Sequence, residues 1–90
     1  MSITLKIHPD ANHFIKGPSA AEVQGATVGE CLNDLVRQFP DIKTRLFDAK
    51  GTLLNYIDVY VNRASSYPLE LATPVHDGDE LSIIVMIVGG

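Results

Sequence analysis

The sequence lacks the residues that would let a small protein be held together by covalent bonds or by a metal. Cys31 is its only cysteine, so an internal disulfide and a zinc site of several cysteines are both excluded. The three histidines, His8, His13 and His76, lie far apart and have no second ligand type at helical spacing. We therefore expect no bound metal, and a domain of this size must bury most of its apolar side chains.

Basic clusters and long apolar runs are missing as well. Seven Lys and Arg residues are scattered among eleven Asp and Glu residues, so nucleic acid is not expected as a partner. The longest apolar run, Ile83 to Val88, is far shorter than the roughly 20 residues that span a bilayer. The amino end reaches Pro9 and Asp10 too early for a signal peptide. We expect one cytoplasmic domain with no membrane partner.

Alternating apolar and polar residues predict a set of strands. The clearest are residues 2–7 and 56–62, and the last strand covers residues 81–88. A turn over residues 11–17 is expected to lead into a weaker strand that continues through residues 20–25. A short strand is expected over residues 67–75, between Pro68 and Pro74. Gly78 suits the turn before the last strand.

One long helix is predicted between residues 25 and 40. Thr27 and Glu30 form a capping box at its start, and Pro40 stops it. Its apolar stripe is Val28, Leu32, Leu35, Val36 and Phe39. Cys31 lies beside this stripe, so a small core residue is favoured over a nucleophile. A short helical turn should then dock Ile42, Leu46 and Phe47, before a turn at Lys50 and Gly51.

These elements predict an α+β domain. A helical connection lets a later strand join the first in parallel, so we expect a mixed sheet of four to five strands with one main helix across one face. The domain should cover residues 1–88, with Gly89 and Gly90 as a flexible C-terminal tail.

The last strand is apolar on both faces. One interpretation is a central strand that is buried on both sides. The other is that Ile84, Met86 and Val88 form an exposed apolar patch on the open face of the sheet, which would mark a partner site. Tyr56 and Tyr60 would then either cover the edge of the sheet or extend this patch.

The final Gly89 and Gly90 suggest that the chain end is the working part. Glycines without side chains let a terminal carboxylate pass through a narrow channel, although a disordered chain end is the simpler interpretation. A carboxylate must be activated before anything is attached to it, and ATP with magnesium does this on a partner enzyme. The chain has no glycine-rich phosphate loop. It is therefore interpreted as a carrier that binds no cofactor, and as no enzyme itself.

Four segments resemble the ubiquitin-like sulfur carriers, which include the small subunit of molybdopterin synthase and the thiamine-pathway carrier. They are GATVGECLNDLVRQFP, LFDAKGTLLNYIDVYVN, LATPVHDGDELSII and the final Gly-Gly, and the resemblance runs from about Val23 to Gly90. It implies a β-grasp fold. It also implies that a ubiquitin-activating-type enzyme adenylates Gly90, after which a sulfur donor leaves a thiocarboxylate there, with Gly89 as the flexible approach.

The stretches GATVGECLNDL and NYIDVYVN look most like carriers of a thiocarboxylate-dependent cysteine pathway, which work with a cysteine synthase and a metalloprotease. The molybdopterin synthase subunit, whose acceptor is the large subunit of that enzyme, comes next. Arg63 departs from the family, where a glycine often follows the asparagine.

Other functions stay open. One is a protein modifier joined through Gly90 to lysines, and another is a non-covalent binding module. Asp77, Asp79 and Glu80 are interpreted as a solvated turn, with a charged contact to the activating enzyme as the alternative.

Overall fold

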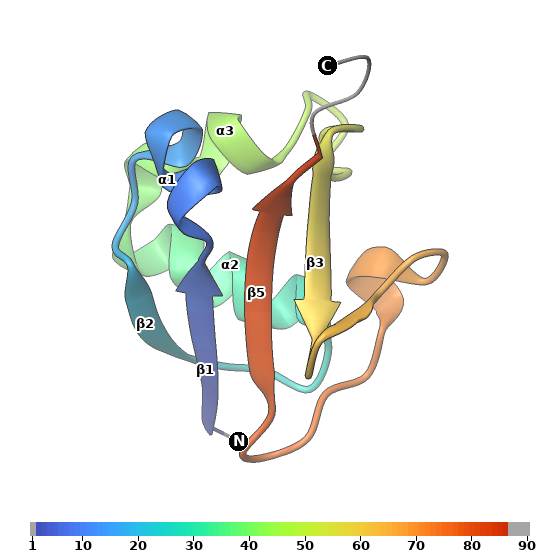
Figure 1. Cartoon of the computed structure of the whole chain (residues 1–90). Helices are drawn as coiled ribbons and strands as arrows, with labels where there is room; N and C mark the ends of the chain where they lie inside the picture. Colours follow the sequence, from blue (N-terminus) through green and yellow to red (C-terminus); the bar gives the residue numbers. More distant parts are fainter. Residues whose placement is uncertain (1, 87–90) are drawn as a thin grey trace.

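The structure is a computed structural model that describes residues 2–86, and it contains a five-stranded mixed sheet with helices (Figure 1). In chain order the elements are β1 (Ser2–Ile7), α1 (Pro9–Ile15), β2 (Ala20–Gln24), α2 (Val28–Gln38), the 3-10 helix η1 (Pro40–Ile42), α3 (Lys43–Leu46), β3 (Ile57–Val61), β4 (Ala64–Ser65), the 3-10 helix η2 (Glu70–Ala72) and β5 (Glu80–Val85). The strand order is β2-β1-β5-β3-β4. β1 and β5 are parallel, and the other pairs are antiparallel. The predicted α+β, β-grasp fold is confirmed.

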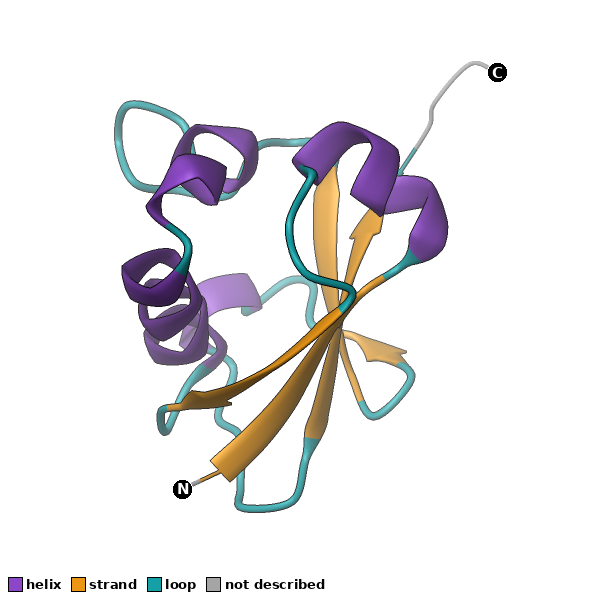
Figure 2. Cartoon of the chain, turned by 90° about the vertical axis from the view of Figure 1, so that its left-hand side faces the viewer, coloured by secondary structure: helices purple, strands orange, loops and turns teal. Residues whose placement is uncertain are grey.

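The core lies between the sheet and α2. Along each strand, alternate side chains point to this side, and Leu5, Val59 and Ile83 are fully buried there. Leu32 and Leu35 of α2 meet them in a single cluster. Seen from the side, the sheet twists and the longest helix packs against one of its faces (Figure 2). The opposite face of β5 and β3 is left without a long helix.

Thr27 and Glu30 cap the start of α2 as predicted, although the Glu30 side chain bonds the N–H one residue before the N-cap and not that of the N-cap itself. Thr27 Oγ1 accepts a hydrogen bond from the Glu30 backbone N–H at 3.2 Å, while Glu30 Oε1 accepts from the Ala26 N–H at 2.8 Å. The helix ends at Gln38, before Pro40. The prediction that Phe39 belongs to the apolar stripe of the helix is wrong: Phe39 follows the last helical residue with an extended φ of −134°, and the residue is 37% exposed.

Polar side chains of α2 cover the outer edge of β2. Asp34 Oδ2 accepts from the Gln24 N–H at 3.0 Å, and Gln38 Nε2 donates to the Glu22 carbonyl at 3.0 Å. Arg37 pairs with the same Asp34, and its hydrogen bond is the largest reason why the pKa of that carboxyl lies below its usual range. These bonds occupy edge groups that would otherwise be open to another strand.

A helix replaces the turn predicted over residues 11–17. α1 begins at Pro9, which suits a first helical turn because its missing N–H would be unpaired there. Ala11 and Ile15, four residues apart, are buried in this helix. Two buried positions in two turns are too short a pattern to separate a helix from a loop.

The short strand predicted over residues 67–75 is also wrong. That segment contains η2, while the short strand β4 lies just before it, at Ala64–Ser65. η2 packs against α2 at Gly29, where an added Cβ would lie 3.1 Å from the Leu71 carbonyl oxygen. Packing against a helix therefore overrides the local strand pattern here.

Candidate functional site

The open face of the sheet carries the candidate site. Across β3 and β5, Asp58 lies opposite Ile84 and Tyr60 lies opposite Ser82, so Tyr60 and Ile84 are diagonal neighbours on one face. Both are partly buried. Met86 follows directly after β5 and is 41% exposed.

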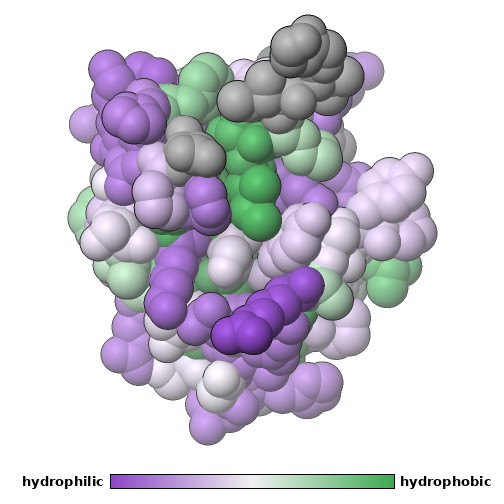
Figure 3. All heavy atoms as spheres, in the orientation of Figure 1, coloured by the Kyte–Doolittle hydropathy of each residue, from purple (hydrophilic) through white to green (hydrophobic). Residues whose placement is uncertain are grey.

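This arrangement decides between the two interpretations of the last strand. Leu81 and Ile83 are fully buried, whereas Ser82 and Ile84 are only partly buried. β5 is therefore covered on one face and open on the other. Apolar atoms gather over the upper part of β5 on the face shown in Figure 3, with polar side chains to the left of them and below them.

Three of the predicted partner-binding residues, Tyr60, Ile84 and Met86, thus share one surface, which we call the open-face patch. Their role in binding stays a prediction. Val88, Gly89 and Gly90 lie outside the described residues, so their predicted roles stay predictions as well.

Tyr56 does not extend the open-face patch. Its ring contacts Phe14 of α1 edge to face, with the ring centroids 5.3 Å apart. The Arg45 guanidinium lies 5.9 Å from the centre of the Phe14 ring and donates to the Phe14 carbonyl at 2.8 Å. Tyr56 therefore joins β3 to the helices at this end of the sheet.

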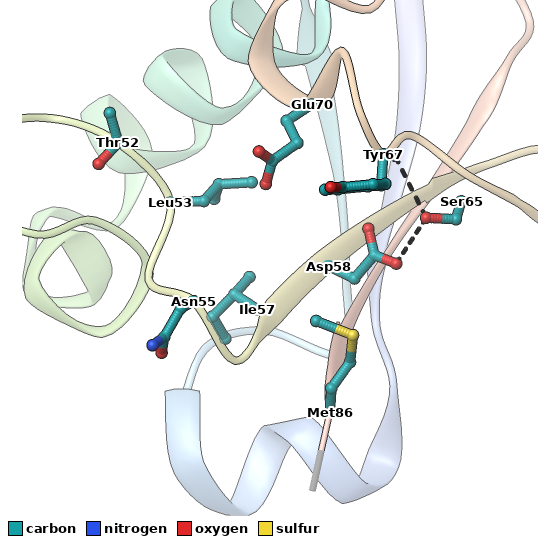
Figure 4. A pocket seen from close by; sticks show the side chains of 9 residues that line it. All are labelled: Thr52, Leu53, Asn55, Ile57, Asp58, Ser65, Tyr67, Glu70 and Met86. Carbon is teal, nitrogen blue, oxygen red and sulfur yellow. Dashed lines mark hydrogen bonds between the residues drawn. The ribbon is translucent and has the colours of Figure 1, made fainter. Parts of the chain in front are cut away.

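A groove of about 560 Å³ runs beside β3, next to Met86 (Figure 4). Its lining residues come from β3, β4, the two loops that flank them, η2 and the end of β5: Thr52, Leu53, Asn55, Ile57, Asp58, Ser65, Tyr67, Glu70 and Met86. Figure 4 shows Glu70 reaching in from one side, with Asp58 of β3 and Met86, directly after β5, opposite it. The groove and the open-face patch meet at Met86.

The sequence prediction missed Asp58 and Tyr67. Asp58 is only 7% exposed and accepts a hydrogen bond from Ser65 Oγ at 2.7 Å, while Tyr67 is 73% exposed. A charged residue in the middle of an otherwise apolar and aromatic strand was the available signal for Asp58. The position of Tyr67 depends on a loop that was predicted to be a strand.

Two other candidates are structural. Cys31 is buried in α2, and this burial raises the pKa of its thiol to about 11, so the thiol stays protonated at neutral pH and is no nucleophile. Asp79 lies in the turn before β5, and its Oδ1 accepts a hydrogen bond from Asn62 Nδ2 at 2.9 Å. This bond is the main cause that lowers the pKa of Asp79. Asp79 therefore ties the β3–β4 turn to the start of β5.

The described residues contain no group of three or more His, Cys, Asp or Glu side chains that could hold a metal ion. None of the helices between residues 2 and 86 has the length and hydropathy needed to cross a membrane.

A β-grasp sheet with an apolar patch on its open face, and with Gly89 and Gly90 four and five residues after β5, is the arrangement of small ubiquitin-like carrier and modifier domains. Residues 16–90 match the ThiS family. The chain belongs to this family, and the predicted resemblance to ubiquitin-like sulfur carriers is confirmed.

Relatives support the same assignment. The chain is 29% identical to the sulfur carrier protein CysO of Mycobacterium tuberculosis over 93 aligned positions, and the match covers all of both chains. A CysO chain in a complex with BexX from Amycolatopsis orientalis is 32% identical, with 98% and 99% of the two chains covered and a TM-score of 0.80. SAMP1 of Haloferax volcanii is 28% identical over all of both chains, with a TM-score of 0.83. The present chain also shares its fold, and the fold alone, with a chain in the complex of molybdopterin-converting factor subunits 1 and 2 from Helicobacter pylori. That match has 19% identity and a TM-score of 0.64, and it covers all of both chains.

Proposed function

We propose that this chain is a sulfur carrier that works through the carboxylate of Gly90. A ubiquitin-activating-type partner enzyme would bind ATP and magnesium. The Gly90 carboxylate oxygen attacks the α-phosphorus of ATP, and pyrophosphate leaves. Sulfide from a sulfur donor then attacks the acyl carbon, AMP leaves, and a thiocarboxylate remains.

The observation that carries this proposal is similarity to CysO over the full length of both chains, together with Gly89 and Gly90 in the sequence. Because the stretches GATVGECLNDL and NYIDVYVN resemble carriers of a thiocarboxylate-dependent cysteine pathway, a cysteine synthase is the favoured acceptor of the sulfur, and the large subunit of molybdopterin synthase comes second. The chain supplies a carrier surface and a terminal acyl group, and the catalysis belongs to its partners.

The open-face patch supports the same function. Met86 is exposed four residues before Gly90, so an enzyme that holds the patch also holds the acyl group close to its own active site. Tyr60, Ile84 and Met86 are the described residues that we assign to this contact, and Val88 continues it in the sequence. A methionine adapts its shape to more than one partner, as a carrier that visits an activating enzyme and an acceptor requires.

The test is the intact mass of the protein after incubation with ATP, magnesium, a sulfide source and the adenylating enzyme of the same organism. We expect one terminal oxygen to be replaced by sulfur, and no change in a chain that lacks Gly90. Unchanged mass of the full chain with every adenylating enzyme of the organism would refute the proposal.

A second candidate function is conjugation to proteins, because SAMP1, a small archaeal modifier protein, is similar over the whole chain. A modifier would end in an isopeptide bond between Gly90 and a lysine. Immunoblots of cells would then show a ladder of larger conjugates, which a pure carrier does not give. A non-covalent binding module is distinguished by the deletion of Gly90, which would leave its binding intact.

A further inference from the structure

The groove beside β3 has a one-sided charge. Two carboxylates, Asp58 and Glu70, line it, and none of its lining residues is basic. Asp58 is the unusual member, because a carboxylate at 7% exposure has lost most of its hydration.

Asp58 has no cation to compensate this loss within residues 2–86. The hydroxyl of Ser65, a neutral group, donates to one of its oxygens, and the same Ser65 Oγ accepts from the Tyr67 N–H at 3.2 Å. The Ser65 hydroxyl thus holds the carboxylate in place and joins it to the Tyr67 loop. A positive group that enters the groove would meet a carboxylate that is already oriented and desolvated.

The other lining residues favour a planar cation. Tyr67 is 73% exposed, and its ring extends between Glu70 and Asp58 in Figure 4. A guanidinium can stack on such a ring while its N–H groups reach a carboxylate, which an ammonium group does less well. The apolar stem of an arginine would lie against Met86 at the mouth of the groove. A metal ion is a poorer match, because only two acidic side chains line the groove.

We propose that this groove receives an arginine side chain of the adenylating enzyme. The proposal rests on the proposed function and names the polar contact that accompanies the open-face patch. It also limits where this arginine lies. Gly90 is four positions after Met86 in the sequence, and four steps of extended chain span at most about 14 Å. The arginine should therefore project from the enzyme surface within roughly this distance of the adenylation site, plus the width of the groove.

The experiment measures the affinity of the full chain and its variants for the adenylating enzyme by calorimetry. Asp58→Asn keeps the shape of the side chain and an acceptor for Ser65, and we expect it to weaken binding at least about 30-fold, because it leaves the guanidinium buried without its counter-charge. Glu70→Gln should weaken binding about threefold as a more exposed pair, and Tyr67→Ala about tenfold. Asp41→Asn is the matched control, because it removes the same charge from η1, away from the groove, and should bind like the wild type.

Thermal melting of each variant shows whether it is folded. If Asp58→Asn does not fold, Glu70→Gln and Tyr67→Ala decide the question, since both side chains reach solvent. Wild-type affinity for these two variants overturns the arginine proposal, and so does a loss of affinity in Asp41→Asn as large as in Glu70→Gln.

A second measurement tests whether a metal ion, in place of an arginine, occupies the groove. Amide resonances of Ser65 and Tyr67 should shift when the enzyme is added and stay unchanged with magnesium chloride alone. A shift with magnesium alone would assign the groove to a metal ion and overturn the proposal. The intact-mass experiment separates this proposal from the proposed function. If the wild type and all groove variants gain sulfur on Gly90 at equal rates, the arginine contact alone is refuted. If the wild type neither binds the enzyme nor gains sulfur, the proposed function and the arginine contact are both refuted.

Discussion

At the scale of single residues, Arg63 occupies a backbone position that suits glycine. Val61 pairs with Ala64, so Asn62 and Arg63 form a two-residue hairpin loop, with φ values of 50° and 74°. Positive φ at both positions is the requirement of a type I′ turn, for which Asn-Gly is the preferred pair. Asn62 meets this requirement, whereas Arg63 must hold a conformation that costs a side-chain residue about 1–2 kcal/mol.

Arg63→Gly should therefore stabilise the protein by about 1 kcal/mol, after allowing for the greater freedom of glycine in the unfolded chain. Urea denaturation measures the change in the free energy of unfolding. The contrasting change is Arg37→Gly within α2, which should destabilise by more than about 1 kcal/mol, because it loses helix propensity together with the pair to Asp34. If both substitutions destabilise the protein equally, the positive φ at Arg63 does not lower the free energy of unfolding.

Cys31 gives the protein a pH dependence on the alkaline side. Burial raises the pKa of its thiol from 9.0 to about 11, and the negative charges of Glu30 and Asp34 add to this shift. The folded state therefore holds the proton more tightly than the unfolded state. The resulting stability is fully present below pH 9 and is lost as the pH rises toward 11.

The expected loss is on the order of 2 kcal/mol relative to a Cys31→Ala variant, in which this titration is absent. Unfolding free energies of both proteins between pH 7 and pH 11 measure it, and the difference between the two curves isolates the thiol from the tyrosines and lysines that titrate in the same range. Parallel curves would show that the thiol is accessible to solvent in the folded protein.

At the scale of elements, α2 depends on its first turn. Thr27 is an N-cap whose side chain satisfies one of the N–H groups that a helix leaves unpaired. Thr27→Ala should cost about 1 kcal/mol of stability. Thermal or urea unfolding measures this, and Thr44→Ala in α3, where Thr44 is exposed and makes no cap, is the control that should leave stability within about 0.5 kcal/mol. An equal effect of both would mean that the capping bond contributes nothing.

At the scale of the whole molecule, the sheet has one covered and one open face, and the effect of a substitution in β5 or directly after it should depend on which face the residue lies on. Met86→Asp places a charge at the exposed end of the open-face patch, so stability should change by less than about 1 kcal/mol. Sulfur loading by the adenylating enzyme should slow about tenfold, as for the loss of an apolar contact at an interface.

Ile83→Asp is the contrasting change, because it buries an unpaired carboxylate in the core and should abolish folding. Circular dichroism follows folding, and intact mass against time follows loading. Unfolding of Met86→Asp would show that the strand end is buried in solution, and unchanged loading would remove the open-face patch from the contact with the enzyme.

By itself, the sequence determined the regular part of this protein. Thr27 and Glu30 marked the start of α2, the alternation of Ile3, Leu5 and Ile7 marked β1, and Gly51 and Gly78 marked turns where φ is indeed 83° and 89°. Each of these signals is local, because caps, strand periods and positive φ depend on residues that are neighbours in the chain. The family resemblance also rested on local segments, and the predicted role of Gly90 followed from that resemblance.

Only the tertiary structure decided which face of β5 is open, because both faces are apolar and the choice depends on which strands flank it and where α2 lies. It also placed Asp58, Ser65 and Tyr67 around one groove with Met86, although β5 is far from β3 in the sequence. The helix α1 and the 3-10 turn η2 were missed for a related reason: each is short, and contacts with β5, α3 or α2 stabilise it rather than its own sequence pattern. Contacts between distant segments are set by the packing of the whole domain, and no local pattern encodes them.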